Sequence, residues 1–558
     1  LPIPKVMQYQ LADGWTSVSF VRPAHGLVAL HGDDIVAVRA LGLVAGRTTH
    51  GHRFEAKASP ITLRSAATYV EQLRDEGAVI VSFVARRAEI ERQLSVAAGR
   101  EAGLKPILDD ALLDEVTGLV ERPNVLVCEF EKEFLEVPPE CLILTMQANQ
   151  KYFPLFDAAG VLSNRFLVVS NITPADPGRV IDGNERVVRP RLADAKFFFD
   201  QDRKKKLEDR VAGLDKVVYH ARLGTQGERV KRIRAIACWV AERIGADLDD
   251  ADRAAMLAKA DLLTDMVGEF PELQGIMGGY YAKHDGEEPD VVAAIRSQYV
   301  NRNTDKNWAS NLVGAALLVA DRTETMVGIW GIGVKPTGEK DPYALRRHAL
   351  TLIDAFSLFE ANDPHGHRLP LPALLEFSRS TFTVPLHADT VHEIEAFIYE
   401  RKANQLAMLY DTKAIGAVLE LKPPLQQVTG RVQAVCEFQK LDAAAALASA
   451  NKRVANILRK SEKAASVPID NALLREGAEI ALFDALAAVE PGSAAAFESG
   501  DYAASLRALA QLRNPVDAFF DQVMVNVEDP VLRNNRLALL AKLHAAMNRV
   551  ADLSRLSS

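Results

Sequence analysis

Apolar residues follow two different patterns along the 558-residue chain. Up to about residue 180, short runs of β-branched and other apolar residues end at Gly, Pro or charged residues, which is typical of short strands. Helical patterns at 86–99 and 107–121 interrupt these runs. The predicted strands are Gly26–Gly32, Ile35–Arg39, Ala78–Ser82, Asn124–Phe130, Glu140–Met146 and Arg165–Asn171.

From about residue 200 onward, apolar residues recur every three to four positions, and this period predicts helices. Pro-rich segments at 362–372 and 422–424 mark boundaries between groups of helices. Gly and Pro at Pro491-Gly492 and Asn514-Pro515 punctuate the Ala-rich C-terminal part. The predicted helices are 202–212, 226–243, 250–267, 289–299 and 308–328.

A last helix is predicted from about Asn535. Its apolar residues fall on one face, which leaves the basic residues largely off that face. The apolar face comprises Leu537, Leu540, Leu543, Met547 and Val550, and the basic residues are Arg536, Lys542, Arg549 and Arg555.

The length exceeds what a single hydrophobic core supports, so we expect several domains of the α+β class. A mixed strand-rich region is predicted for 1–200, a helical domain for 201–360, a linking region for 361–440 and a helical domain for 441–558.

Composition places the chain among globular proteins, with 48% hydrophobic and 25% charged residues. The longest uncharged apolar run, Leu312–Ala320, is shorter than the roughly 20 residues of a membrane span, so no membrane partner is expected. The chain opens without a signal peptide and without Met, at Leu1, which suggests a truncated N-terminus. Four widely spaced cysteines suit a reducing cytoplasm: Cys128, Cys141, Cys238 and Cys436.

The net charge of −8 conceals a basic segment. Residues 186–234 contain 15 Lys or Arg and 7 Asp or Glu, a local charge of +8, so the remainder carries −16. A polyanion responds to charge within about a Debye length, roughly 8 Å, and not to the total. Net acidity therefore does not exclude RNA as a partner.

One glycine-rich segment, Gly333–Lys340, comes close to a phosphate-binding loop. In such a loop Lys directly follows the second glycine, whereas here Glu339 holds that place. Pro336 also removes one N–H that would face the phosphates. A structured turn is the better interpretation.

Four residues in the helical region are spaced like the ligands of an HD-type metal-dependent phosphohydrolase. They are His220, Asp261, His284 and Asp321. Asp261 follows Ala260 where the motif needs histidine, and losing that imidazole weakens the hold on a cation that must acidify its water. We expect a degenerate HD-like site that holds no metal, although a working hydrolase is the alternative.

The basic segment begins with Gly183–Lys206, in which three aromatic residues, Phe197–Phe199, follow several cations. Guanidinium and ammonium groups bind phosphate oxygens, and arginine also stacks on bases. The Phe residues fit a protein core equally well. The candidate RNA-binding cations are Arg189, Arg191, Lys196, Arg203, Lys204, Lys205 and Lys206.

The sequence contains no HIGH, KMSKS, GxSxG or HExxH motif. Seven long, chemically mixed blocks instead run in order along the chain: Thr145–Pro154, Gly183–Phe199, Lys259–Phe270, Gly328–Gly333, Lys340–Arg347, Asp517–Val525 and Leu532–Leu540. These blocks resemble the beta subunit of bacterial two-subunit glycyl-tRNA synthetases.

The resemblance implies a B3/B4-like mixed region, an HD-like domain, a body-tail segment and a helical anticodon-binding domain. It also implies a heterotetramer of two alpha and two beta chains, in which alpha uses ATP and Mg to join glycine to tRNA(Gly). The beta chain then binds and orients tRNA and holds no cofactor itself. For the anticodon end, the candidates are Lys452, Arg453, Arg533 and Arg536.

Overall fold

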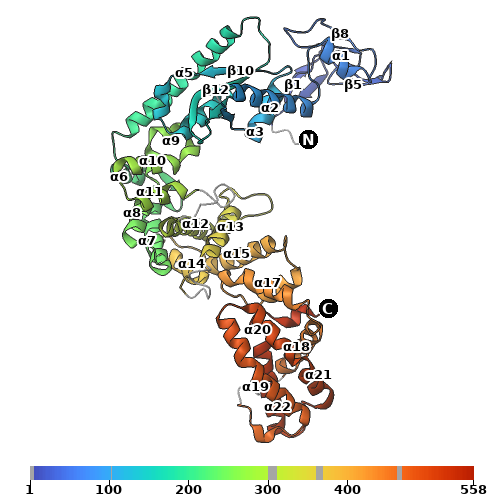
Figure 1. Ribbon diagram of the computed structural model, residues 1–558, viewed down its shortest axis with the longest axis vertical. Coiled ribbons are helices and arrows are strands. Elements are labelled where there is room, and N and C mark those ends of the chain that lie inside the picture. Colours follow the sequence, from blue (N-terminus) through green and yellow to red (C-terminus); the bar gives the residue numbers. More distant parts are fainter. Residues whose placement is uncertain (1–4, 102, 300–310, 360–367, 461–467, 558) are drawn as a thin grey trace. The chain divides into compact units, whose positions relative to one another are not determined.

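The computed structural model describes residues 5–101, 103–299, 311–359, 368–460 and 468–557. The chain divides into two compact units, Leu1–Lys204 and Lys205–Ser558 (Figure 1). Each unit is described by itself below.

The first unit begins with small antiparallel pairs of strands and one short helix. Ile61, Leu63 and Leu73 form a small apolar core there. The pairs are β1 (Met7–Gln10) with β2 (Ser17–Phe20), β3 (Leu30–His31) with β4 (Asp34–Ile35), β5 (Arg39–Ala40) with β6 (Leu43–Val44), and β7 (Thr48–Thr49) with β8 (Ile61–Thr62), followed by α1 (Tyr69–Asp75).

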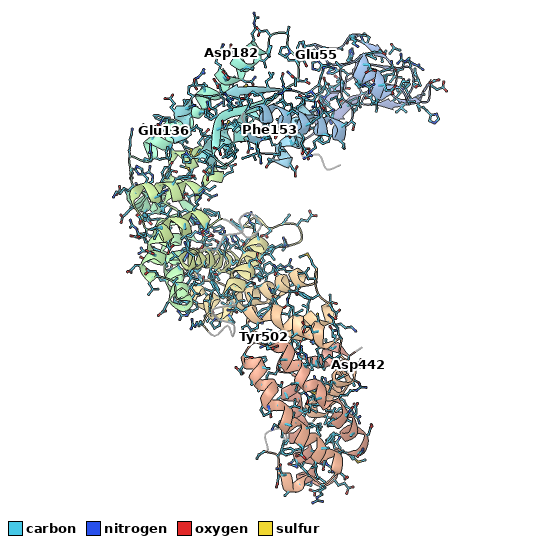
Figure 2. The ribbon with its side chains drawn as sticks, viewed as in Figure 1. Glu55, Glu136, Phe153, Asp182, Asp442 and Tyr502 are labelled. Carbon is cyan, nitrogen blue, oxygen red and sulfur yellow. The ribbon has the colours of Figure 1, made fainter. Side chains whose placement is uncertain are left out.

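A four-stranded antiparallel sheet of order β10-β12-β11-β9 forms the centre of this unit. Helices α2 and α3 contribute Ile90, Leu94 and Val116 to a core with the sheet residues Phe153 and Leu167 (Figure 2 labels Phe153). The elements are α2 (Phe83–Arg100), β9 (Lys105–Pro106), α3 (Asp110–Leu119), β10 (Asn124–Glu129), β11 (Phe153–Phe156) and β12 (Leu162–Ser170).

A 26-residue helix, α5 (Pro177–Asp202), completes the first unit. Successive strand residues point to opposite faces, so Phe166 lies across β12 from Leu167. Phe166 stacks on Tyr152, whose hydroxyl donates a hydrogen bond to Asn184 of α5 over 2.8 Å. Short turns between the strands also contact α5: η1 (Lys132–Glu136), α4 (Pro139–Leu144) and η2 (Thr145–Asn149).

The second unit is built from helices around α12 (Leu312–Gly331). Every residue of α12 from Val313 to Gly331 is buried, which fits a helix that is apolar on nearly all sides. Its neighbours are α7 (Gln226–Ile244), α8 (Leu248–Leu257), α11 (Pro289–Ser297), α13 (Leu345–Leu358), α14 (Leu371–Ser380) and α15 (Thr390–Leu406). The remaining elements there are α6 (Leu207–Val211), η3 (Ala212–Lys216), β13 (Val218–His220), β14 (Gly224–Thr225), η4 (Ala260–Leu263), α9 (Asp265–Glu269), η5 (Pro271–Leu273) and α10 (Ile276–Asp285).

The C-terminal helices of the second unit pack as a bundle in which α19 contacts α20, α21 and α22 (Figure 1). Its elements are α16 (Thr412–Leu419), η6 (Leu425–Gln427), α17 (Val428–Phe438), α18 (Ala444–Arg459), η7 (Asn471–Leu473), α19 (Gly477–Glu498), α20 (Tyr502–Leu509), η8 (Ala510–Leu512), α21 (Arg513–Gln522), α22 (Pro530–Met547) and η9 (Leu553–Leu556).

Among the described residues, α19 is the one helix long and apolar enough by composition to match a membrane span, with a mean hydropathy of 1.4. One such helix is weak evidence for a membrane protein. Glu479 of α19 forms a buried ion pair with Arg536 of α22, as expected of a helix in a bundle.

The structure confirms the change from mixed to helical structure, and the molecule as a whole is mainly helical with small sheets. The strands predicted at Asn124–Phe130 and Arg165–Asn171 are present as β10 and β12. The prediction of a strand at Glu140–Met146 is wrong, because those residues form α4 and the start of η2. Ala78–Ser82 forms no strand either, and Ser82 instead caps α2.

Proline and glycine misled the helix predictions at three places. Helix α5 was not predicted, because it includes Gly183 and Pro190. Pro491 lies inside α19 and Pro515 inside α21, so neither marks a break. The last helix begins at Pro530, earlier than predicted. Residues 308–310 of one predicted helix, and 362–367 of the first Pro-rich boundary, lie outside the described residues.

Candidate nucleic-acid interface

A groove runs along α18 in the C-terminal bundle. Two adjoining cavities of about 360 and 540 Å³ share Arg453, Ile457 and Asn526 in their linings. Helix α18 forms one wall, and the end of α21 with the segment before α22 forms the other. The full lining is Ser449, Lys452, Arg453, Asn456, Ile457, Lys460, Phe520, Asp521, Gln522, Val523, Met524, Val525 and Asn526.

The chemistry of the groove suits unpaired nucleotides. The Arg453 guanidinium lies 4.3 Å from the centroid of the Phe520 ring, which gives a flat cationic platform. Bases stack on such platforms, and side-chain amides such as those of Asn456 and Asn526 hydrogen-bond to base edges. Lys452 and Lys460 add positive charge against the single acidic group in the lining, Asp521.

Two of the four anticodon candidates, Lys452 and Arg453, line this groove, while Arg533 and Arg536 lie behind it. Arg536 is only 3% exposed and ion-paired with Glu479, and its Nη1 donates to the Met524 carbonyl over 2.6 Å. Arg533 donates to the Val527 carbonyl over 3.3 Å. Both therefore fix the backbone of the loop that forms the second wall. Arg536 was predicted to lie largely off the apolar face of the last helix, but the structure buries it.

Several of the candidate cations lie on α5, and two of them are ion-paired with carboxylates. Arg189 pairs with Glu131 over 2.5 Å, and Lys196 pairs with Glu136 over 2.8 Å (Figure 2 labels Glu136). Helix α5 itself holds five Lys or Arg and five Asp or Glu, so the helix is neutral overall. The positive excess of the predicted basic segment therefore lies beyond it.

The remaining cations of that segment differ in how freely they are presented. Arg203 is stacked on Phe199 at 4.4 Å and ion-paired with Asp200 over 2.6 Å. Arg191 is exposed and forms no ion pair with a described residue. Lys204, Lys205 and Lys206 are exposed at the junction of the two units. Among the three aromatic residues, Phe199 is buried while Phe197 is 57% exposed.

The four residues predicted for a degenerate metal site do not form one cluster. Asp261 and Asp321 are both buried near Lys259. His284 lies six residues beyond Gly278, the glycine whose N–H binds Asp261, or about 9 Å along α10. His220 packs against Tyr343 with ring centroids 5.9 Å apart. Among the described residues, no group of three His, Cys, Asp or Glu side chains could hold a metal ion.

A buried lysine ammonium pairs with one of these two aspartates, Asp321. Lys259 is 1% exposed, and its Nζ lies 2.8 Å from Asp321 and 2.7 Å from the Tyr299 hydroxyl. Burial lowers the pKa of Lys259 to about 8, with the Asp321 carboxylate opposing that shift. Burial raises the pKa of Asp261 to about 6, although the Gly275 N–H hydrogen bond opposes it. These groups do not suit a divalent cation, because the ammonium would repel it.

Asp321 is the centre of a larger buried network of charges. Arg229 lies 3.0 Å and Arg322 2.5 Å from its carboxylate oxygens. Glu324 in turn pairs with Arg229 and Arg232 over 3.0 and 2.8 Å. Burial alone would raise the pKa of Asp321, but the surrounding cations hold it far below its usual value.

The glycine-rich segment Gly333–Lys340 forms a closed turn. Thr337 and Lys340 exchange backbone hydrogen bonds of 3.0 and 2.8 Å, and Arg346 donates to the Gly338 carbonyl. Asp341 then accepts from the N–H groups of Leu345 and Arg346 at the start of α13. These contacts agree with the interpretation of this segment as a structured turn.

The sequence alone did not single out Phe520, Asn526 or Met524 as part of a site. Phe520 belongs to the resembling block Asp517–Val525, which was used for recognition and not searched for chemistry. An aromatic residue and exposed amides close to α18 in space, but about 70 positions away in sequence, leave no local signal. Met524 stands in an apolar run of the sequence, which suggests burial, but its side chain is 71% exposed.

The geometry of this C-terminal groove agrees with what comparison with known proteins finds. Residues 447–553 match the family model of the DALR anticodon binding domain. The C-terminal bundle is therefore a domain of the class that recognises tRNA anticodons.

Residues 1–420 match the family model of the glycyl-tRNA synthetase beta subunit. The chain is 59% identical over 562 residues to the glycine–tRNA ligase beta subunit of Thiobacillus denitrificans, which covers 100% of this chain and 79% of that protein. It is 60% identical to the corresponding protein of Janthinobacterium sp. and 59% identical to that of Leptothrix cholodnii, covering 79% and 80% of those proteins. The chain belongs to the glycyl-tRNA synthetase beta subunit family.

This membership decides between the two functions that the sequence left open. A metal-dependent phosphohydrolase is not supported, because the matched family is a synthetase family and the Lys259 ammonium is ion-paired with Asp321.

Proposed function

We propose that the chain is the tRNA-binding, non-adenylating beta subunit of a glycine–tRNA ligase. An alpha subunit joins glycine to ATP and transfers it to tRNA(Gly), using Mg, while this chain binds and orients the tRNA. The observation that carries the proposal is the α18 groove, in a domain matched as an anticodon-binding domain and lined by the Arg453–Phe520 platform.

Within the groove, Lys452 and Arg453 are the residues assigned to anticodon binding. Arg453 stacks on one base, and Lys452 neutralises a nearby phosphate. Arg533 and Arg536 act as positioning residues, because their hydrogen bonds to the Val527 and Met524 carbonyls fix the opposite wall.

A second contact to tRNA is assigned to the phosphate backbone on the acceptor side. Arg191 and Lys204–Lys206 are the primary candidates, since they are exposed and no described carboxylate pairs with them. Arg189, Lys196 and Arg203 can contribute only by leaving Glu131, Glu136 or Asp200, which reduces their net gain.

The division of labour has a physical basis. A subunit that grips tRNA at two separated sites converts a weak encounter into an oriented one, and orientation alone contributes several kcal/mol to a reaction. We assign a B3/B4-like region to 1–200, an HD-like domain to 201–360, a body-tail region to 361–440 and the anticodon domain to 441–558. The proposed assembly is a cytoplasmic heterotetramer of two alpha and two beta chains.

The test combines this chain with a purified alpha subunit of a close relative. Glycine-dependent pyrophosphate exchange measures adenylate formation, and charging of tRNA(Gly) measures transfer. We expect exchange to need alpha only and charging to need both chains. Glycyl-adenylate made by this chain alone, or full charging without it, would overturn the proposal.

A variant within this assay separates the groove from the assembly. Arg453→Ala should impair charging by raising the KM for tRNA, while pyrophosphate exchange stays unchanged. Arg507→Ala, an exposed arginine on α20 of the same bundle, is the matched control. Equal losses in both variants would show that the groove is not the tRNA site.

A further inference from the structure

A separate cavity in the second unit lies beside α12, far along the chain from the groove. Its volume is about 400 Å³, within the range of small-molecule sites. Residues from β13, α7, η5, α12 and α13 form its walls. The lining is Tyr219, Arg229, Glu272, Gln274, Tyr299, Asp321, Arg322, Thr325, Tyr343, Arg347, His348 and Thr351.

Positive charge exceeds negative charge in and around this cavity. The lining carries three arginines and two carboxylates, a balance of +1. Lys259, Arg232 and Glu324, which ion-pair with lining or network residues, raise the balance to +2. An anion that enters the cavity would therefore meet a favourable field, strengthened by the low dielectric of the buried walls.

Arg347 is the cation in this lining best placed to bind a ligand directly. Arg229 and Arg322 are held by Asp321 and Glu324, whereas Arg347 is exposed and forms no ion pair with a described residue. His348 follows it on α13, and Thr351 lies one turn later on the same face. The Nδ1 atom of His348 is buried and has no hydrogen-bond partner among the described residues.

The pKa of His348 agrees with an excess of positive charge in this cavity. Burial, together with the charges of Arg322, Arg229 and Arg347, lowers the pKa of His348 to about 3, while the Asp321 carboxylate opposes the shift. A neutral imidazole beside an exposed guanidinium offers several hydrogen-bond donors in a small space. The Thr351 hydroxyl donates to the Arg347 main-chain carbonyl over 2.9 Å and so is not one of them. Such a set fits the oxygens of a phosphate group.

The other side of the lining offers acceptors and aromatic rings. Glu272 and Gln274 can accept hydrogen bonds from sugar hydroxyls or an amino group, and the Glu272 carboxylate would repel a second phosphate. Tyr219, Tyr299 and Tyr343 provide flat apolar surface. A ligand with one phosphate, hydroxyl groups and a planar part satisfies all of these features.

We propose that this cavity binds a terminal phosphate monoester of a nucleotide, with the phosphate against Arg347 and His348, and does not hydrolyse it. The ammonium of Lys259, ion-paired with Asp321, repels the cation that hydrolysis would need. A free nucleoside monophosphate and the 5′ end of an RNA both present this chemistry. The site is distinct from the groove on α18.

Isothermal titration calorimetry of the full chain tests the proposal, with AMP, adenosine and inorganic phosphate as probes. We expect AMP to bind at one site, phosphate to bind more weakly and adenosine to give no detectable binding. A second arm compares tRNA(Gly) transcripts with and without a 5′-phosphate, which separates a free nucleotide from an RNA end. Release of phosphate from AMP would overturn the non-hydrolytic role.

Arg347→Glu should weaken the affinity for whichever probe binds, AMP or the 5′-phosphorylated tRNA, by about tenfold or more. This loss is expected when a charge-assisted hydrogen bond to an anion is removed. Lys231→Glu, the same change of charge at an exposed position of α7, should leave it within about twofold. Tyr343→Ala tests the aromatic wall independently, and the melting temperature of each variant shows that it has folded. The proposal is wrong if neither AMP nor the 5′-phosphate gives binding that Arg347→Glu weakens.

Discussion

Two arginine-rich regions of the second unit use the same side chain in opposite ways. Around Asp321, Arg229 and Arg322 are buried, and each is satisfied by carboxylates and hydrogen-bond acceptors. Along α18, Arg453 faces a solvent-filled groove and is stacked on a ring instead of being paired with a carboxylate. The first arrangement stabilises the fold, and the second leaves a charge available to a ligand.

The comparison teaches that pairing, and not the number of cations, decides what an arginine does. A buried charge that loses its partner is costly, whereas an exposed one is nearly free to change. The following four experiments test this difference, beginning with the largest expected effect.

Removal of the central carboxylate should affect stability most. Asp321→Ala leaves Lys259, Arg229 and Arg322 buried without their shared partner, and we expect a loss of about 3–5 kcal/mol in the free energy of unfolding. Urea unfolding followed by circular dichroism measures it. Asp252→Ala breaks the half-exposed pair with Arg234 and is the matched control, with an expected loss below about 1 kcal/mol. Equal losses would contradict the structural role of the network.

Truncation in the groove should instead affect tRNA affinity. Arg453→Ala removes the stacking platform on Phe520 and should cost about 1–3 kcal/mol in binding, with the melting temperature nearly unchanged. Fluorescence anisotropy with labelled tRNA(Gly) measures the dissociation constant, and Arg507→Ala serves as the control. A fall in stability without a loss of affinity would place Arg453 with the buried arginines.

Acidification should weaken the fold through His348. Its folded-state pKa of about 3 lies below the ordinary value of 6.5, so the unfolded chain binds a proton more readily. Its contribution is fully present above pH 6.5 and is lost as pH falls toward 3, by up to about 1.4 kcal/mol per pH unit.

The measurement compares urea unfolding of the wild type and His348→Gln at pH 7 and pH 5. The variant should lose less stability between these values, whereas His392→Gln, at an exposed position, should behave as the wild type does. Identical pH dependence in the wild type and His348→Gln would show that the imidazole is protonated in the folded protein.

The smallest effect is expected on α5. Arg191→Ala should lower tRNA affinity more than Arg189→Ala, because Arg189 already pairs with Glu131, but the difference should stay below about 1 kcal/mol. Binding at several salt concentrations should show a salt dependence lower by about one ion for Arg191→Ala. A larger loss for Arg189→Ala would mean that its ion pair opens on binding.

The periodicity of apolar residues was sufficient to predict helices with a continuous buried face, such as α7 and α12. It failed where composition is ambiguous. The run Cys141–Leu144 suits a strand or a buried helix equally, and only its packing shows that it belongs to α4. Helix α5 includes Pro190 and was missed, because proline removes one hydrogen bond without ending a helix that other contacts support.

The candidate site could be predicted only in part, for a different reason. Lys452 and Arg453 were candidates from the sequence, and both line the groove along α18. The role of Arg536 depends on Glu479, which lies 57 positions away, and no local pattern reveals that pair. Similarly, Lys259 and Asp321 meet only after α12 has packed into the second unit.

The hydrogen bond from Arg536 to the Met524 carbonyl has a consequence for how the groove can diversify. Because Arg536 binds the main chain of Met524, the exposed Met524 side chain is not needed to hold the loop in place. Exchanging that side chain would alter what nucleotides touch while the course of the polypeptide stays the same. Position 524 is therefore where selectivity could be retuned with the least disturbance of architecture.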